Sequence, residues 1–161
     1  MKIRRLLFAT DFSDSSKDAL THATYLATEL RADLGLVHVF ERPFFVESGV
    51  SHRLQIRHDV DQWLRETKTD AQQRLEALAK DLRAQGLNVT TFFREGVPFV
   101  EILKVAEEIP ADLIVIGTHG RTGLSHVLIG SVAERVVRGA TSAVLAVRPT
   151  HPAAGQKAGD A

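Results

Sequence analysis

ADLIVIGTHGRTGLSHVLIGSVAERVVRGATSAVLAVRP, residues 111–149, is the stretch that decides the fold of this chain. The run from Leu113 to Ile116 is short and entirely apolar, which is typical of a strand buried on both faces of a parallel sheet. A segment rich in Gly, Thr, Ser and His follows, from Gly117 to Gly130. Ser131 and Glu134 have the spacing of a capping box, which predicts a helix with Ser131 as its N-cap. A second apolar run ends the stretch and predicts another strand.

A glycine-rich loop that leads into a helix N-terminus is a favourable place for an anion. Free backbone N–H groups and the positive end of the helix dipole both attract phosphate. Gly117 and Gly120 lack a Cβ, so the backbone can turn sharply and approach a ligand closely. We expect Gly130 and Ser131 to offer their amides to a phosphate. A plain strand-to-helix loop would explain the first two glycines equally well, and simple helix capping would explain the last two residues.

The spacing of these residues, together with other motifs, resembles the universal stress protein family in its ATP-binding branch. Two residues separate Gly117 from Gly120, and nine residues then lead to Gly130-Ser131. LLFATDFSDSS is similar to the family's first strand and loop, LVHVF to its second strand, GVPFVEIL to the entry of its third helix, and TSAVLAVRP to its last strand. The resemblance covers nearly the whole chain and implies a nucleotide-binding regulatory protein.

The composition is that of one globular domain without an excess of either charge. The chain has 161 residues, of which 44% are apolar, with 20 basic and 20 acidic side chains and no Cys. The balanced charge argues against a nucleic-acid partner, which requires a basic surplus. No apolar run reaches the roughly 20 residues that span a bilayer, so no membrane partner is expected. The absence of Cys fits the cytoplasm. We expect one domain over residues 1–149 and a disordered tail over 150–161.

Apolar runs alternate with amphipathic patterns along the chain, which predicts an α/β fold with a doubly wound, five-stranded parallel sheet and helices on both faces. Ser13 or Ser15 is expected to cap the first helix, and Pro98 to begin the third. Residues 41–58 are expected to form a long loop or a lid with a short helix, within an insertion that spans 41–68 and is either functional or a variable surface feature. The resemblance implies the strand order 3-2-1-4-5 of an adenine nucleotide alpha hydrolase-like fold.

In that strand order the first and fourth strands are neighbours, and ligands bind at the carboxyl ends of such a pair. The resemblance implies that Asp11 meets the nucleoside, that the backbone of Val39 reads the adenine edge, and that the glycine loop holds ribose and phosphates. For Asp11 the alternative is N-capping of the next helix, and for Val39 it is a plain core position. The complete set of candidate binding residues is Ala9, Thr10, Asp11, Val39, Ile116, Gly117, His119, Gly120, Arg121, Gly130, Ser131, Val132 and Ala133.

The expected cofactor is ATP, with ADP or AMP not distinguished by the sequence, and Mg²⁺ would accompany ATP. His119 and His126 have no acidic or Cys partner at ligand spacing, so no protein-bound metal is expected. His119 is interpreted as a loop residue near phosphate. Arg121, the only cation within the loop, is expected either to screen phosphate charge or to be solvated.

The sequence leaves several functional classes open. The patterns of P-loop proteins, of dinucleotide-binding proteins and of the nucleophile elbow are absent, and the loop offers no evident general base. No catalytic residue is therefore assigned, and a nucleotide-binding regulatory module is favoured over a dedicated enzyme. The alternatives are a slow ATPase or adenylate-transferring relative with the same fold, and a chaperone-like interaction dimer that binds no nucleotide.

The last apolar run also predicts how two copies of the chain associate. In the implied order it lies at a sheet edge, and an apolar edge is a template for pairing with another strand. The family pairs this strand about a two-fold axis, which implies a homodimer. The alternative is an edge covered by the C-terminal tail. The residues of the expected interface are Ala143, Val144, Leu145, Ala146 and Val147.

Overall fold

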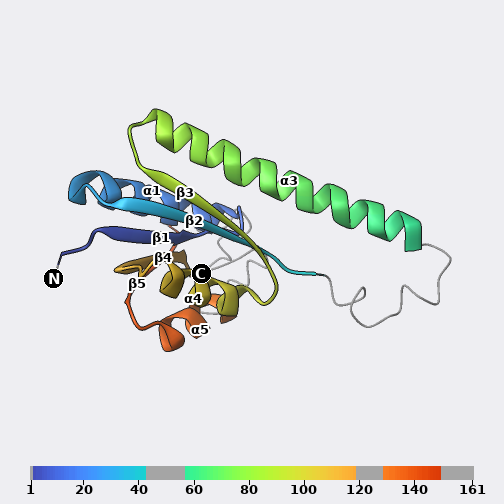
Figure 1. The fold of residues 1–161 in the computed structure, drawn as a ribbon. Coiled ribbons are helices and arrows are strands. Elements are labelled where there is room, and N and C mark those ends of the chain that lie inside the picture. The colour runs from blue at the N-terminus through green and yellow to red at the C-terminus, as the bar shows by residue number, and fades with distance from the viewer. Residues whose placement is uncertain (1, 43–56, 119–128, 150–161) are drawn as a thin grey trace, which may run out of the picture.

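The computed structural model describes residues 2–42, 57–118 and 129–149, which form a layered α/β fold (Figure 1). A five-stranded parallel sheet is the central layer, and its order is β3-β2-β1-β4-β5, as the resemblance implied. The strands are β1 (Arg5–Ala9), β2 (Asp33–Phe40), β3 (Val89–Glu95), β4 (Leu113–Gly117) and β5 (Ala143–Val147).

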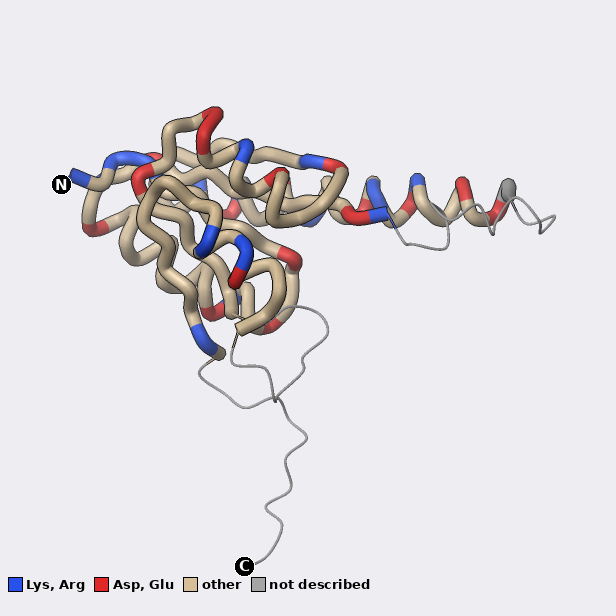
Figure 2. The backbone as a smooth tube through the Cα atoms, turned by 90° about the horizontal axis from the view of Figure 1, so that it is seen from below, with Lys and Arg blue, Asp and Glu red and all other residues tan. Residues whose placement is uncertain are grey.

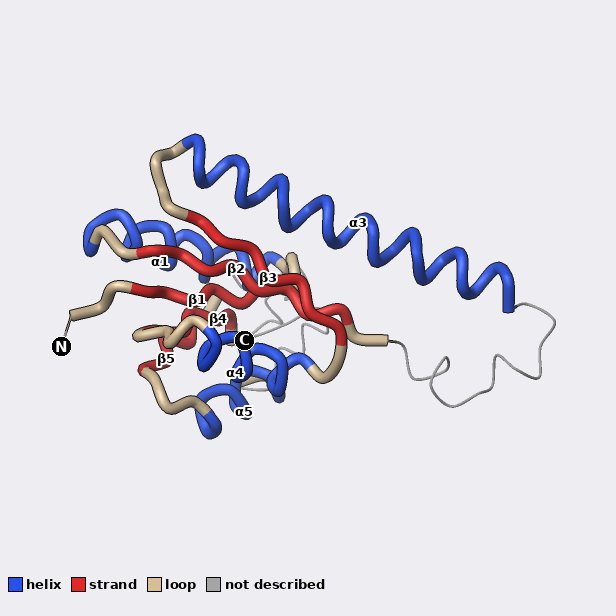
Figure 3. The backbone as a smooth tube through the Cα atoms, viewed as in Figure 1, coloured by secondary structure: helices blue, strands red, loops and turns tan. Residues whose placement is uncertain are grey.

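Helices cover both faces of the sheet, which confirms the doubly wound fold (Figure 3). Leu6 and Phe8 of β1 pack into one core and Leu7 and Ala9 into the other, because successive strand residues point to opposite faces. This explains why the central strands read as unbroken apolar runs. One core is closed by α1 (Asp14–Leu30) and α3 (Arg57–Ala84), and the other by α4 (Pro98–Glu108) and α5 (Ser131–Gly139).

The central strands β1 and β4 are aligned so that their carboxyl ends lie together. Near their amino ends, Oδ2 of Asp112 accepts hydrogen bonds from the backbone amides of Arg4 at 2.8 Å and Arg5 at 2.9 Å. These bonds lower the pKa of the Asp112 carboxyl below its ordinary value of 3.8. At the other end Ala9 pairs with Ile116. The loops that follow β1 and β4 therefore begin side by side.

Helix α3 includes part of the predicted insertion. Residues 57–68, which we assigned to a loop or lid insertion, form the first part of this helix. Much of that part extends beyond the strands (Figures 1 and 3), so it needs few apolar residues facing the core. Polar pairs one turn apart are present instead, such as the Gln62 amide on Glu66 at 2.8 Å. Residues 43–56 of the predicted insertion lie outside the described residues.

Charged residues of both signs are interspersed along the chain, most visibly on α3 (Figure 2). Within the three described ranges, no helix combines the length and the apolar character needed to cross a membrane. The predicted tail, residues 150–161, lies outside those ranges.

Candidate functional site

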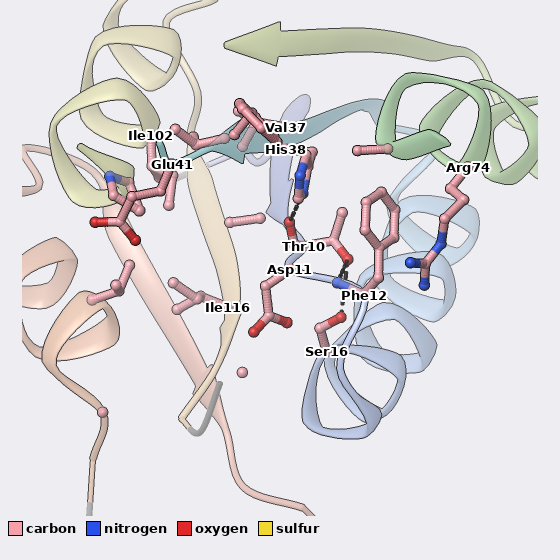
Figure 4. Close-up of a pocket in the computed structure, with 18 of the residues that line it drawn as sticks. Thr10, Asp11, Phe12, Ser16, Val37, His38, Glu41, Arg74, Ile102 and Ile116 are labelled. Carbon is pink, nitrogen blue, oxygen red and sulfur yellow. Dashed lines mark hydrogen bonds between the residues drawn. The ribbon is translucent and has the colours of Figure 1, made fainter. Parts of the chain in front are cut away.

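A cavity of about 550 Å³ opens at the carboxyl edge of the sheet, around the ends of β1, β2 and β4 (Figure 4). After β1 the chain enters α1 on one face, whereas α5, which precedes β5, covers the opposite face. This divergence is the topological switch point at which doubly wound sheets bind ligands. The N-terminal parts of α4 and α5 and one side of α3 complete the walls. The volume is within the range typical of small-molecule sites.

The loop after β1 is held by hydrogen bonds that converge on Thr10. Its Oγ1 accepts a bond from the Phe12 amide at 3.0 Å and shares another with the Ser16 hydroxyl at 2.9 Å. Its backbone carbonyl lies 2.8 Å from Nδ1 of His38. A carbonyl can only accept, so Nδ1 of His38 carries a proton and donates it. Because Thr10, Ser16 and His38 are all buried, this network fixes the wall from which the loop projects.

Asp11 turns its carboxylate toward the open part of the cavity (Figure 4). Its Oδ1 accepts hydrogen bonds from the Ser13 amide at 3.0 Å and the Ser13 hydroxyl at 2.6 Å. Ser13 is the N-cap of α1 and accepts a bond from the Ser16 amide at 3.3 Å, as predicted. The alternative interpretation, that Asp11 itself caps α1, is wrong. Asp11 orients the capping residue and is in turn oriented by it.

The start of α5 differs from the predicted capping box. The N-cap is Gly130, not Ser131, and no side chain caps the helix. The Thr118 carbonyl accepts a hydrogen bond from the Gly130 amide at 2.6 Å, and the Gly130 carbonyl accepts one from the Glu134 amide at 2.9 Å. These two bonds place Gly130 just before the helix and move Ser131 into the first turn. The amide of Gly130 is therefore already used, which corrects the expectation that it would face a phosphate.

The next three amides, of Ser131, Val132 and Ala133, belong to residues that line the cavity. Within the described part of the chain none of these N–H groups has an acceptor, as is usual in a helix's first turn. The positive end of the helix dipole adds to their attraction for negative charge. The entrance of α5 is consequently the part of the cavity best suited to an anion.

The sequence model of the universal stress protein family matches residues 2–148. The chain belongs to the universal stress protein family. It is 35% identical over 145 residues to universal stress protein MJ0531 of Methanocaldococcus jannaschii, covering 90% of this chain and 82% of that protein. The solved structure of MJ0577, a universal stress protein of the same organism, has a TM-score of 0.78 and 28% identity, covering 92% of this chain and 97% of that one. The structure of a universal stress protein from Archaeoglobus fulgidus in complex with dAMP has a TM-score of 0.60 and 21% identity. The match covers 91% of this chain and 99% of that one, and at this identity it supports the fold alone.

Every candidate binding residue that the structure describes lines this one cavity of the universal stress protein fold. The remaining candidates, His119, Gly120 and Arg121, lie outside the described residues, as does His126. Among the residues that the structure does describe, no group of three or more His, Asp or Glu side chains could hold a metal ion. The candidates that lie together are Ala9, Thr10, Asp11, Val39, Ile116, Gly117, Gly130, Ser131, Val132 and Ala133.

Gly117 has a different structural role from the one we expected. We attributed its missing side chain to the approach of a ligand. A Cβ at this position would lie 2.7 Å from Oγ and 2.9 Å from the backbone oxygen of Ser15, in the first turn of α1. The glycine therefore allows α1 to pack closely against β4. In this universal stress protein it contributes to the site by bringing the two halves of the cavity together.

One wall of the cavity, the side of α3, was missed by the sequence analysis. Trp63, Thr67, Asp70 and Arg74 line the cavity at helical spacing, so they share one face of α3. That spacing is visible in the sequence, but nothing local shows which face of α3 meets the sheet edge. The family resemblance gave no candidate on this helix.

Charge is distributed unevenly around the cavity. Three carboxylates, of Asp11, Glu41 and Asp70, line it near β1, β2 and α3, and Arg74 is the one Lys or Arg among its described lining residues. The entrance of α5 lies on another wall and favours negative charge. An anionic ligand should therefore bind with its charged end at α5 and its hydrogen-bond donors toward the carboxylates.

Proposed function

We propose that this member of the universal stress protein family binds an adenine nucleotide in the cavity at the carboxyl edge of the sheet. On this proposal the protein is a nucleotide-responsive regulatory dimer and not a dedicated enzyme. The observation that carries the proposal is the assembly of the described candidate residues, from four separate segments of the chain, around one cavity. A universal stress protein from Archaeoglobus fulgidus was solved in complex with dAMP, and in this proposal we extend that class of ligand to this chain.

In this proposal each wall of the cavity has a role. The phosphates bind at the amides of Ser131, Val132 and Ala133, where the helix dipole favours negative charge. Asp11 accepts hydrogen bonds from the nucleoside. The backbone of Val39 lies beside the edge of the adenine base. Mg²⁺ would enter with the triphosphate, since this ion is commonly held by substrate phosphates and few protein groups.

Calorimetric titration with ATP, ADP and AMP, each with Mg²⁺, tests the proposal. Asp11→Asn keeps an oxygen acceptor for Ser13 but removes the charge offered to the nucleoside. A hydrogen bond to a charged group contributes about 1.5–3 kcal/mol, so affinity should fall roughly 10- to 100-fold. Glu107→Gln makes the same change of charge on the exposed surface of α4 and should leave affinity unchanged.

Two results would reject parts of this proposal. Absence of binding by all three nucleotides, together with no bound nucleotide in freshly purified protein by mass spectrometry, would favour an interaction dimer without a nucleotide. Phosphate release well above the rate in buffer, lost in Asp11→Asn, would favour an ATPase.

The proposed dimer pairs two copies of β5. This strand is at the edge of the sheet, and Val144, Leu145 and Ala146 are each only partly buried. The Val147 carbonyl bonds to Thr118 beside β4, so the alternating amides of Val144 and Ala146 face away from the sheet. Ala146→Pro removes one outward amide and should give a monomeric mass by light scattering, with an unchanged circular dichroism spectrum. A monomeric mass for the unaltered chain at micromolar concentration would reject the dimer.

A further inference from the structure

Phe12 has an unusual backbone conformation for a bulky residue. Its φ is 62°, in the left-handed region that glycine and asparagine adopt readily and phenylalanine does not. It lies between Asp11, which faces the cavity, and Ser13, which caps α1. The dihedral angles of Phe12 set the direction in which the chain carries both neighbours. Such a conformation persists only where its surroundings hold it in place.

Two side chains from different elements hold the ring of Phe12. The imidazole of His38, on β2, packs on one side with 4.5 Å between ring centroids and an angle of 31° between planes. The guanidinium carbon of Arg74, on α3, lies 4.4 Å from the ring centroid, which is the geometry of a cation–π contact. His38 is itself fixed by its bond to the Thr10 carbonyl and by the ring of Phe93, 5.7 Å away.

Arg74 is placed to act on the site through Phe12. Figure 4 shows the phenyl ring between the guanidinium and the Asp11 carboxylate. Among the described residues, Arg74 pairs with the carboxylate of Asp70 at 3.9 Å, and the Arg74 side chain is 48% exposed. Its contact with the Phe12 ring is consequently what connects Arg74 to the loop that carries Asp11.

We propose that Arg74 and His38 are positioning residues that clamp Phe12 in its left-handed conformation and thereby aim the Asp11 carboxylate at the nucleotide. This inference rests on the proposed nucleotide-binding function and goes beyond it. Arg74 then contributes to the site through the ring of Phe12 and not by contact with the ligand. Nucleotide affinity then depends on a contact between α3 and the loop that precedes α1, which no binding motif contains.

The test combines Arg74→Ala with Phe12→Asn, because asparagine tolerates the left-handed conformation and offers no ring. In the protein that keeps Phe12, Arg74→Ala removes an exposed cation–π contact and should weaken ATP binding about two- to fivefold. In the Phe12→Asn background, Arg74→Ala should cause no further loss, since the clamp is already absent. Arg65→Ala, which removes a cation from the same helix away from the ring, is the matched control.

A second measurement does not depend on the nucleotide. Backbone ¹⁵N order parameters of Asp11, Phe12 and Ser13 should fall in nucleotide-free Arg74→Ala and stay unchanged in Arg65→Ala. Equal losses of affinity in both Phe12 backgrounds would show that Arg74 meets the ligand directly and would overturn the proposal. Unchanged order parameters in Arg74→Ala would overturn it as well. If the unaltered protein binds no adenine nucleotide, the proposed function fails, while the order parameters still decide whether the clamp exists.

Discussion

Replacing Gly117 by Ala should destabilise the protein because the new methyl group has no space. The Cβ would lie 2.7 Å from Oγ, 2.9 Å from the backbone oxygen and 3.1 Å from the carbonyl carbon of Ser15. Two of these atoms belong to the backbone at the start of α1, so rotation of one side chain cannot relieve the contact. Overpacking of this kind costs about 1–3 kcal/mol. For a chain of this length each kcal/mol lowers Tm by roughly 2–4 °C, so a decrease of roughly 2–12 °C is expected.

Gly139→Ala is a matched control for this substitution. Its Cβ would also meet an atom at 2.7 Å, but that atom is Cδ1 at the flexible end of Leu103, and the other two contacts are at 3.9 Å. Leu103 can rotate, and Ala is favoured over Gly within a helix by about 1 kcal/mol. Calorimetry should therefore give a Tm close to that of the unaltered protein. The reasoning is refuted if Gly117→Ala is as stable as the unaltered protein, or if both variants lose the same amount.

Three further substitutions test the loop and the strand ends. Thr10→Val removes the hydroxyl that is hydrogen-bonded to the buried Ser16 hydroxyl, so the free energy of unfolding in urea should fall by about 1–3 kcal/mol. Thr10→Ser keeps a hydroxyl and should lose much less stability. Ser13→Ala removes the N-cap of α1 and should cost about 1 kcal/mol by the same measurement; no loss would contradict the capping role. Asp112 has a pKa below 3.8 when folded, so its contribution to stability is present above about pH 4 and is lost as the pH falls through the folded pKa. The free energy of unfolding of Asp112→Asn should accordingly fall less than that of the unaltered protein between about pH 5 and pH 2. Identical acid profiles for the two proteins would show that Asp112 contributes nothing.

The central strands and the loops that follow them could be predicted because their signals are local. A parallel strand covered on both faces is an unbroken apolar run, as in β1 and β4, and it ends where polar residues begin. The order of the strands came from the family resemblance, and order is what brings Asp11 and the entrance of α5 to one cavity. That combination was sufficient to place every described candidate residue around the same cavity.

The features that could not be predicted depend on contacts between segments distant in the sequence. The first part of α3 extends past the sheet and carries few apolar residues, so its local pattern is weak. The N-cap of α5 is fixed by the Thr118 carbonyl, which a capping-box pattern does not include. The contact of Arg74 with Phe12 joins two elements that no motif relates. In each case the deciding partner is known only once the chain has folded.

Gly117 shows how fold stability and site geometry become coupled in this molecule. Its missing side chain lets the first turn of α1 approach β4, and that turn also contains Ser16, whose hydroxyl holds Thr10 beside the cavity. A side chain at position 117 would displace this turn and with it the loop that carries Asp11. Larger residues at position 117 should therefore lose nucleotide affinity together with stability. Asp11→Asn should lose affinity while its Tm changes little, because it retains an oxygen for Ser13. A series of substitutions at position 117 in which affinity stayed constant while Tm fell would show that the cavity does not depend on the packing of α1 against β4.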